Sequence, residues 1–105
     1  MQPPAAPQTE NTAAPNTLYG FFHPQCGHCK NFMPVWNQLK QQYESSPAVN
    51  IKTIDATKPE SERIIFYYGV SAFPTVIMAT PEQNIEYDGN RSLDDLRMFV
   101  EKNVK

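Results

Sequence analysis

The chain has 105 residues, a length that fits one domain with one hydrophobic core. Its formal net charge is −2 and no basic patch stands out, which argues against nucleic acid or an anionic membrane as the main partner. No apolar run approaches the roughly 18 residues of a membrane-spanning helix. The first residues lack the apolar segment of a signal peptide, so none is visible in this sequence.

The two cysteines, Cys26 and Cys29, form a C-x-x-C motif. Small secreted scaffolds usually carry four or more cysteines. A disulfide that closes so short a loop adds little stability. The pair is therefore predicted to have a chemical role rather than a structural one.

Residues 1–16 are rich in proline and alanine and contain no aromatic side chain and no large aliphatic one apart from Met1. This composition predicts a disordered tail or a semi-rigid tether, with a trimmed linker as the alternative. Residues 17–105 are predicted to form the folded domain.

The folded part begins with a short apolar run at 18–22, which predicts a buried strand. A helix is expected from Cys26, with Pro34 inside it as a source of a kink. Apolar side chains recur at spacings of three and four along this helix and define its core face. They are Cys29, Phe32, Trp36, Leu39 and Tyr43.

Residues 49–55 alternate and are rich in β-branched side chains, which predicts a second strand. Thr57 and Glu60 have the spacing of a capping box and predict a helix that ends at Gly69. Further strands are expected at 74–78 and 85–87.

Ser92 and Asp95 form a second capping-box pattern before the last helix. The predicted order is therefore βαβαββα. The first two strands should be parallel and the last two should form an antiparallel hairpin. The fold class is α/β, with a mixed four-stranded sheet flanked by three helices.

Cys26 and Cys29 at a helix start can close a disulfide, and the free N–H groups there favour a thiolate at Cys26. Cys26 is predicted to be the nucleophile. Cys29 lies on the core face and is predicted to be more buried, with a higher pKa, and to resolve the mixed disulfide. A histidine beside the thiolate, His28, would stabilise the reduced form.

The segment 21–30 resembles the active-site segment of protein disulfide isomerase domains in the thioredoxin superfamily. Gly27 and His28 between the cysteines are the isomerase version of the motif. Pro34 and the segments 68–75 and 87–91 match the same family, so that the resemblance covers residues 17–105.

This resemblance implies a thioredoxin-like fold and activity on protein thiols. It implies that the peptide bond between Phe73 and Pro74 is cis and that this loop binds substrate by strand addition. It places Arg91 where isomerase domains carry a mobile arginine, whose charge would lower the pKa of Cys29. The strand and helix that usually come first in this fold are missing, which would leave a sheet edge open to partners.

Three positions depart from the family. Gly20 stands where a buried carboxylate usually serves the resolving cysteine. Gln25 replaces a tryptophan that offers substrate an aromatic platform, and His23 replaces a small residue. His23 lies three residues before Cys26, so it is a candidate to reach the thiolate, and both His23 and Gln25 are candidate substrate contacts.

Three alternatives stay open beside an oxidase or isomerase of protein thiols. Zinc could be bound by His23, Cys26, His28 and Cys29. A tetrahedral zinc site, however, needs ligands that converge from two segments of the chain, and the sequence has no second cluster of such residues. The domain could be a substrate-binding module with weak turnover, or a reductase of the thioredoxin type. We expect no metal or organic cofactor, a redox partner for recycling and an oxidising compartment; the oligomeric state is not readable.

Overall fold

The computed structural model of the chain describes residues 14–104. In chain order the elements are β1 (Asn16–Phe22), α1 (Gly27–Gln42), β2 (Val49–Asp55), the 3-10 helix η1 (Pro59–Ser61), α2 (Glu62–Tyr68), β3 (Thr75–Ala79), β4 (Asn84–Glu86) and α3 (Leu93–Asn103). The predicted order of strands and long helices is confirmed. The predicted tail lies almost wholly outside the described residues.

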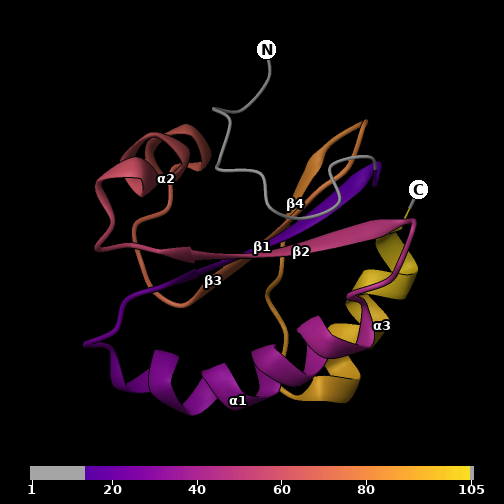
Figure 1. The fold of residues 1–105 in the computed structure, drawn as a ribbon, viewed down its shortest axis with the longest axis horizontal. Helices are drawn as coiled ribbons and strands as arrows, with labels where there is room; N and C mark the ends of the chain where they lie inside the picture. Colours follow the sequence, from indigo (N-terminus) through magenta and orange to yellow (C-terminus); the bar gives the residue numbers. More distant parts are fainter. Residues whose placement is uncertain (1–13, 105) are drawn as a thin grey trace.

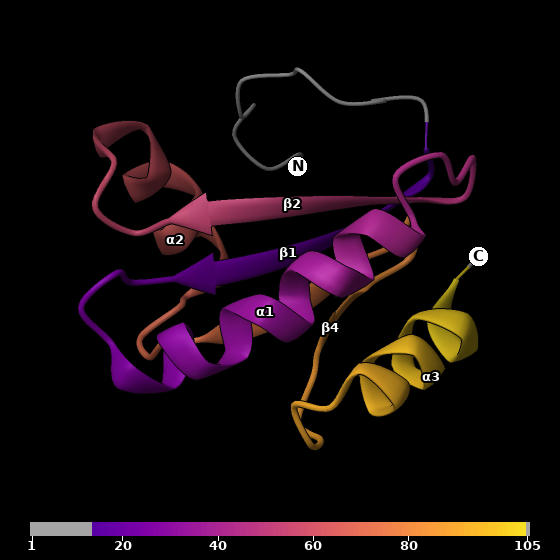
Figure 2. The ribbon, with the colours of Figure 1, turned by 60° about the horizontal axis from the view of Figure 1, so that its bottom comes forward.

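The described strands form a four-stranded sheet in the order β2-β1-β3-β4. Strand β1 is parallel to β2 and antiparallel to β3, and β3 is antiparallel to β4. Helices α1 and α3 lie on one side of this sheet and α2 lies on the other (Figures 1 and 2). The predicted α/β fold with a mixed sheet and an antiparallel hairpin is confirmed, and β2 lies at a sheet edge of the described chain.

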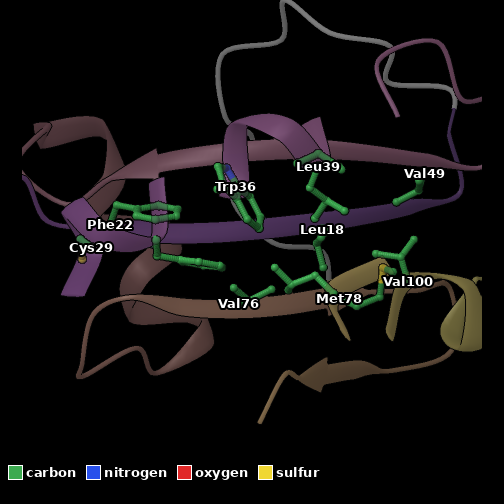
Figure 3. Close-up of a cluster of buried hydrophobic side chains, with 12 residues drawn as sticks. Leu18, Phe22, Cys29, Trp36, Leu39, Val49, Val76, Met78 and Val100 are labelled. Carbon is green, nitrogen blue, oxygen red and sulfur yellow. The ribbon is translucent and has the colours of Figure 1, made fainter. Parts of the chain in front are cut away.

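Alternation along β1 builds a core on each face of the sheet. Leu18 and Phe22 belong to the larger cluster under α1 and α3, whereas Tyr19 and Phe21 belong to a smaller cluster under α2. Figure 3 shows the larger cluster, with Trp36 reaching from α1 toward the sheet. The amphipathic face of α1 predicted from residue spacing is the face that packs here, and α1 runs without a break through Pro34.

Gly20 of β1 makes room for the indole of Trp36. A Cβ atom at Gly20 would lie 2.7 Å from Trp36 Cε2, closer than side chains pack. The indole is fully buried, and its Nε1–H donates a hydrogen bond of 2.8 Å to Thr53 Oγ1 on β2. Trp36 therefore fills the place beside β1 where a side chain at position 20 would lie.

The helix ends confirm one predicted cap and correct another. Ser92 caps α3, because its Oγ accepts a hydrogen bond of 3.2 Å from the Asp95 N–H. Thr57 caps nothing: its N–H and its hydroxyl both donate to Asp55 Oδ1, and η1 begins after Lys58. Helix α2 ends as predicted at Gly69, whose φ of 66° is left-handed.

Candidate redox site

Cys26 is the residue that caps the N-terminus of α1. Its Sγ accepts a hydrogen bond of 3.4 Å from the Cys29 N–H, so the sulfur meets the unpaired donors of the first helical turn. Both cysteines are free thiols in this structure. The helix start thus places the two thiols side by side on one turn.

Cys29 lies one turn further along α1 and is buried. Its side chain is 2% exposed and packs in the larger core cluster, close to Phe22 (Figure 3). Its Sγ accepts a hydrogen bond of 3.4 Å from the backbone N–H of His23. The predicted difference in burial between the two cysteines is confirmed.

The pKa values of the two thiols move in opposite directions. The pKa of Cys26 is lowered, first by a hydrogen bond from the Cys29 thiol, then by backbone N–H groups of Cys29 and His28, and by the charge of Arg91. Burial raises the pKa of Cys29, although the His23 N–H and Arg91 oppose this rise. These directions favour the thiolate, which is the reacting form of a cysteine, at Cys26 rather than at Cys29.

The loop before β3 faces Cys26. The peptide bond between Phe73 and Pro74 is cis, as the resemblance implied. The Cys26 thiol donates a hydrogen bond of 3.4 Å to the Phe73 carbonyl oxygen. Phe73 is half-buried, and its ring centroid lies 6.0 Å from that of His23. A backbone carbonyl therefore lies within reach of anything bound at Cys26.

His23 and Gln25 contact each other. The Gln25 N–H donates a hydrogen bond of 3.2 Å to His23 Nδ1, and the Gln25 side chain is exposed. The backbone N–H of His23 also donates to Cys29 Sγ, and a contact of the His23 ring with Cys26 stays a prediction.

The remaining predicted residues surround the pair. Gly27 is exposed and begins α1. The His28 imidazole is exposed, and the His28 backbone N–H lowers the pKa of Cys26. Arg91 is exposed with its Cζ 6.0 Å from the centroid of the Phe32 ring. Its charge lowers the pKa of both cysteines, the direction that the resemblance implied for Cys29.

A hollow of about 230 Å³ adjoins Cys29 and includes residues that sequence reasoning missed. Thr53 and Asp55 line it from β2, opposite Lys30 and Met33 of α1, and Phe22, His23 and Pro24 complete its wall. Alternation in the 49–55 strand puts Thr53 and Asp55 on one face, but only the parallel pairing of β1 with β2 brings that face to Cys29.

A second, more open hollow of about 640 Å³ lies on the other side of His23. Ile65 and Phe66 of α2 line it together with Val70 and Phe73. Phe66 is 88% exposed, which is unusual for a large apolar side chain. A largely apolar hollow thus lies between α2, His23 and the Phe73 loop.

No group of three or more His, Cys, Asp or Glu side chains converges to hold a metal ion within residues 14–104. His28 and His23 turn to different surroundings, the first to solvent and the second to Gln25 and Phe73. In the same part of the chain, no helix has the length and apolar character needed to cross a membrane.

Known proteins match this chain in sequence and in fold. The thioredoxin family model matches residues 8–102. Protein disulfide-isomerase erp38 of Neurospora crassa is 40% identical over 81% of this chain and 24% of its own length. Protein disulfide-isomerase 1 of Caenorhabditis elegans is also 40% identical, over 78% of this chain and 16% of its own.

The first thioredoxin domain of mouse protein disulfide-isomerase A4 superposes with a TM-score of 0.72 at 28% identity, covering 84% of this chain and 62% of that structure. The chain spans about a quarter or less of the length of the two curated relatives. Together with the four-stranded sheet and the C-x-x-C helix start, the family match shows that this chain belongs to the thioredoxin family and resembles its protein disulfide-isomerase domains.

Proposed function

We propose that this chain is a thiol–disulfide oxidoreductase that oxidises or isomerises protein thiols through Cys26 and Cys29. The observation that carries this proposal is the placement of two free thiols on one helical turn, with Cys26 as the cap of α1 and Cys29 buried behind it. The opposite directions of their pKa shifts agree with this placement. A reactive outer thiolate and a protonated inner thiol are what stepwise disulfide exchange requires. No metal or organic cofactor is needed for this chemistry.

The exchange proceeds in two steps. The Cys26 thiolate attacks a substrate disulfide, which forms a mixed disulfide and releases one substrate thiolate. Cys29 then loses its proton and attacks Cys26 Sγ, which forms the Cys26–Cys29 disulfide and releases the second substrate thiolate. Run in reverse, the same steps oxidise a substrate dithiol and leave both cysteines reduced.

Substrate is proposed to bind along the loop of Phe73 and Pro74. The Phe73 carbonyl lies 3.4 Å from Cys26 Sγ, close enough to pair with the backbone of an extended substrate segment at the attacked cysteine. His23 and Gln25 flank this place and are proposed as further substrate contacts. Protein or peptide thiols fit this site, because an extended backbone is what the loop recognises.

The direction of exchange is proposed from the Gly27–His28 pair. Isomerase-type sites have a reduction potential of about −180 mV, against about −270 mV for thioredoxin. A site of the first kind oxidises or isomerises substrate in an oxidising compartment, such as an endoplasmic-reticulum lumen or the cell exterior, and needs a redox partner for recycling. The relatives named as protein disulfide-isomerases support this direction.

A redox titration tests the proposal. The protein is equilibrated in glutathione buffers, the thiols are trapped with an alkylating agent, and the reduced fraction is read by mass. We expect a midpoint near the isomerase value. A midpoint near the thioredoxin value would assign a reductase instead, and a pair that never equilibrates would overturn the proposal.

A second candidate function is a substrate-binding module with weak turnover. The observation that favours it is Gly20, where Trp36 occupies the space of the family's buried carboxylate. Cys26→Ser separates the two: a binding module keeps its affinity for partner proteins, whereas an oxidoreductase loses all exchange. Cys29→Ser should accumulate the mixed disulfide only in an oxidoreductase.

A further inference from the structure

Resolution requires that the Cys29 thiol release a proton, and this chain lacks the side chain that usually receives it. Position 20 is glycine, and the indole of Trp36 fills the space that a carboxylate there would need. Burial raises the pKa of Cys29, so at neutral pH the resolving group is a protonated thiol. Another group must therefore take up this proton.

The hollow beside Cys29 connects it to one carboxylate. Asp55 is the last residue of β2, is paired in register with Phe22, and lines the same hollow as Cys29. At about 230 Å³ the hollow has the volume for water, whose few polar partners there would come from Cys29, Thr53 and Asp55 in a largely apolar wall. The pairing of β2 with β1 thus brings the Asp55 carboxylate to the hollow that adjoins Cys29.

Asp55 is held in place with one oxygen uncommitted. The Thr57 N–H and hydroxyl donate to Asp55 Oδ1 at 2.9 and 2.7 Å, and within the described chain Oδ2 accepts no hydrogen bond from protein. These two hydrogen bonds, Lys58 and His23 lower the pKa of Asp55. The carboxylate is therefore ionised across the range in which disulfide exchange operates, and a proton that it takes up is held only briefly before it passes to solvent.

We propose that the Asp55 carboxylate is the acceptor of the Cys29 thiol proton, relayed by water across this hollow, in place of the carboxylate absent at position 20. This inference rests on the proposed redox function of the Cys26–Cys29 pair. Asp55 acts on the resolving step alone, because the hollow adjoins Cys29 and does not include Cys26.

The resolving step then balances as follows. The Cys29 S–H bond breaks, its proton passes to Asp55, and the sulfur electron pair forms the bond to Cys26 Sγ. The bond between Cys26 and the substrate sulfur breaks, and the substrate leaves as a thiolate. The cysteine pair is oxidised, the substrate disulfide is reduced, and Asp55 passes the proton to bulk solvent.

Other charged groups face Cys29 or the hollow. Lys30 lines the hollow from α1, His23 lines it from the loop after β1, and Arg91 acts on Cys29 through its charge. Lys30 and Arg91 are cations and cannot accept a proton. His23 is the rival acceptor, although its Nδ1 already accepts the Gln25 N–H.

The test is the rate at which a preformed mixed disulfide on Cys26 is resolved, measured against pH by stopped-flow for the whole chain and for Asp55→Asn. Asparagine keeps an oxygen for the Thr57 donors, so the fold should be preserved. We expect resolution at neutral pH to slow by about tenfold or more, a modest share of what general bases contribute. The loss should vanish at alkaline pH, where Cys29 ionises unaided.

Two further variants complete the design. Asp55→Glu, which restores a carboxylate, should recover most of the rate. Glu44→Gln removes the same charge from an exposed position beyond the other end of α1 and should leave the rate unchanged. If Asp55→Asn does not fold, the Glu variant and a Ser variant at position 55 give the same comparison.

The outcomes distinguish a proton acceptor from a plain charge. If Asp55 acted only as a negative charge, its removal would lower the pKa of Cys29 and speed resolution at neutral pH, which would overturn the proposal. An unchanged rate in Asp55→Asn, or a loss in His23→Gln alone, would also overturn it. If the unmodified chain performs no exchange at all, the proposed function fails instead.

Discussion

At the scale of single residues, two identical side chains acquire different chemistry from their places on one helical turn. Cys26 caps the helix and receives hydrogen bonds, which lower its pKa, whereas Cys29 faces the core, which raises its pKa. The charge of Arg91, which lies in the loop before α3, acts to lower the pKa of both cysteines. The reactivity of each sulfur therefore comes from its surroundings, and substitutions around the pair should change rates without touching a cysteine.

Adding a single methyl group at Gly20 should lower the stability of the fold strongly. A Cβ atom at position 20 would lie 2.7 Å from both Phe22 Cε1 and Trp36 Cε2. Both rings are buried in the core, so neither can move aside freely. We expect Gly20→Ala to lower the free energy of unfolding by about 1–3 kcal/mol, the usual range for overpacking, as measured by urea denaturation.

Gly27→Ala is the matched control for this prediction. A Cβ atom at Gly27 meets nothing within 4 Å, and alanine is the better helix former at the start of α1. Its stability should stay within about 0.5 kcal/mol of the parent chain. Equal effects of the two substitutions would contradict the view that Trp36 fills the space over Gly20.

The candidate site is readable from sequence only where its residues are adjacent in the chain or match a family segment. Cys26 and Cys29 follow from spacing alone, and Phe73 and Pro74 from resemblance. Asp55 and Thr53 are not readable, because they reach Cys29 only through the parallel pairing of β2 with β1. The orientation of the His23 ring is not readable from the sequence either, because it depends on the contacts of the ring with the Gln25 N–H and the Phe73 ring.

At the scale of elements, hydrophobic periodicity predicts which segments are helices and strands but not how each begins. The long stripe of α1 and the alternation of β1 and β2 are strong signals, and all three elements lie where expected. The expected cap at Thr57 failed for a local reason: Asp55, two residues earlier, takes both Thr57 donors in a turn. A capping pattern in the sequence does not show which of several possible hydrogen-bond partners the capping residue takes in the fold.

Ser92 makes the cap of α3 testable. Its Oγ accepts the Asp95 N–H at 3.2 Å, and Asp94 and Asp95 add negative charge to the first turn. Ser92→Ala should lower the free energy of unfolding by about 1 kcal/mol, the typical cost of losing such a cap. Thermal denaturation followed by circular dichroism measures this change.

Ser45→Ala serves as the control for the cap, because Ser45 is an exposed serine in the turn after α1. Its unfolding should be nearly unchanged, within about 0.5 kcal/mol. A Ser92 variant as stable as the Ser45 variant would show that the cap contributes nothing to the fold. Because α3 packs through Leu96 and Val100 on the cluster that also holds Cys29, the cap also supports the site indirectly.

At the scale of the whole molecule, the sheet order assembles the site from segments distant in sequence. The end of β1 leads into Cys26, and the cis loop before the antiparallel β3 brings the Phe73 carbonyl to it. The end of β2 brings Asp55 to the hollow that adjoins Cys29. Helix α1 then crosses the same face of the sheet as α3 (Figure 2). The fold thus surrounds one helix start on three sides and leaves Cys26 accessible.

This arrangement links the stability of the reduced protein to pH. The folded chain lowers the pKa of Cys26 below its unfolded value of about 8.5, so between the two pKa values the unfolded state binds more protons. The Cys26 contribution to stability is therefore present above the unfolded pKa and is lost as pH falls through the folded pKa. Cys29 has the opposite sign: its raised pKa contributes stability below the unfolded value, which is lost at more alkaline pH.

Urea denaturation of the reduced chain and of Cys26→Ser, at steps from about pH 6 to about pH 8.5, isolates the Cys26 contribution. Serine is itself a good helix cap, so the variant keeps the start of α1 while losing the titrating group. The stability of the parent chain relative to the variant should rise with pH over this range, because only the parent gains a stabilised thiolate. A flat difference would mean that folding does not favour the Cys26 thiolate, and the division of roles between the two cysteines would lose its electrostatic basis.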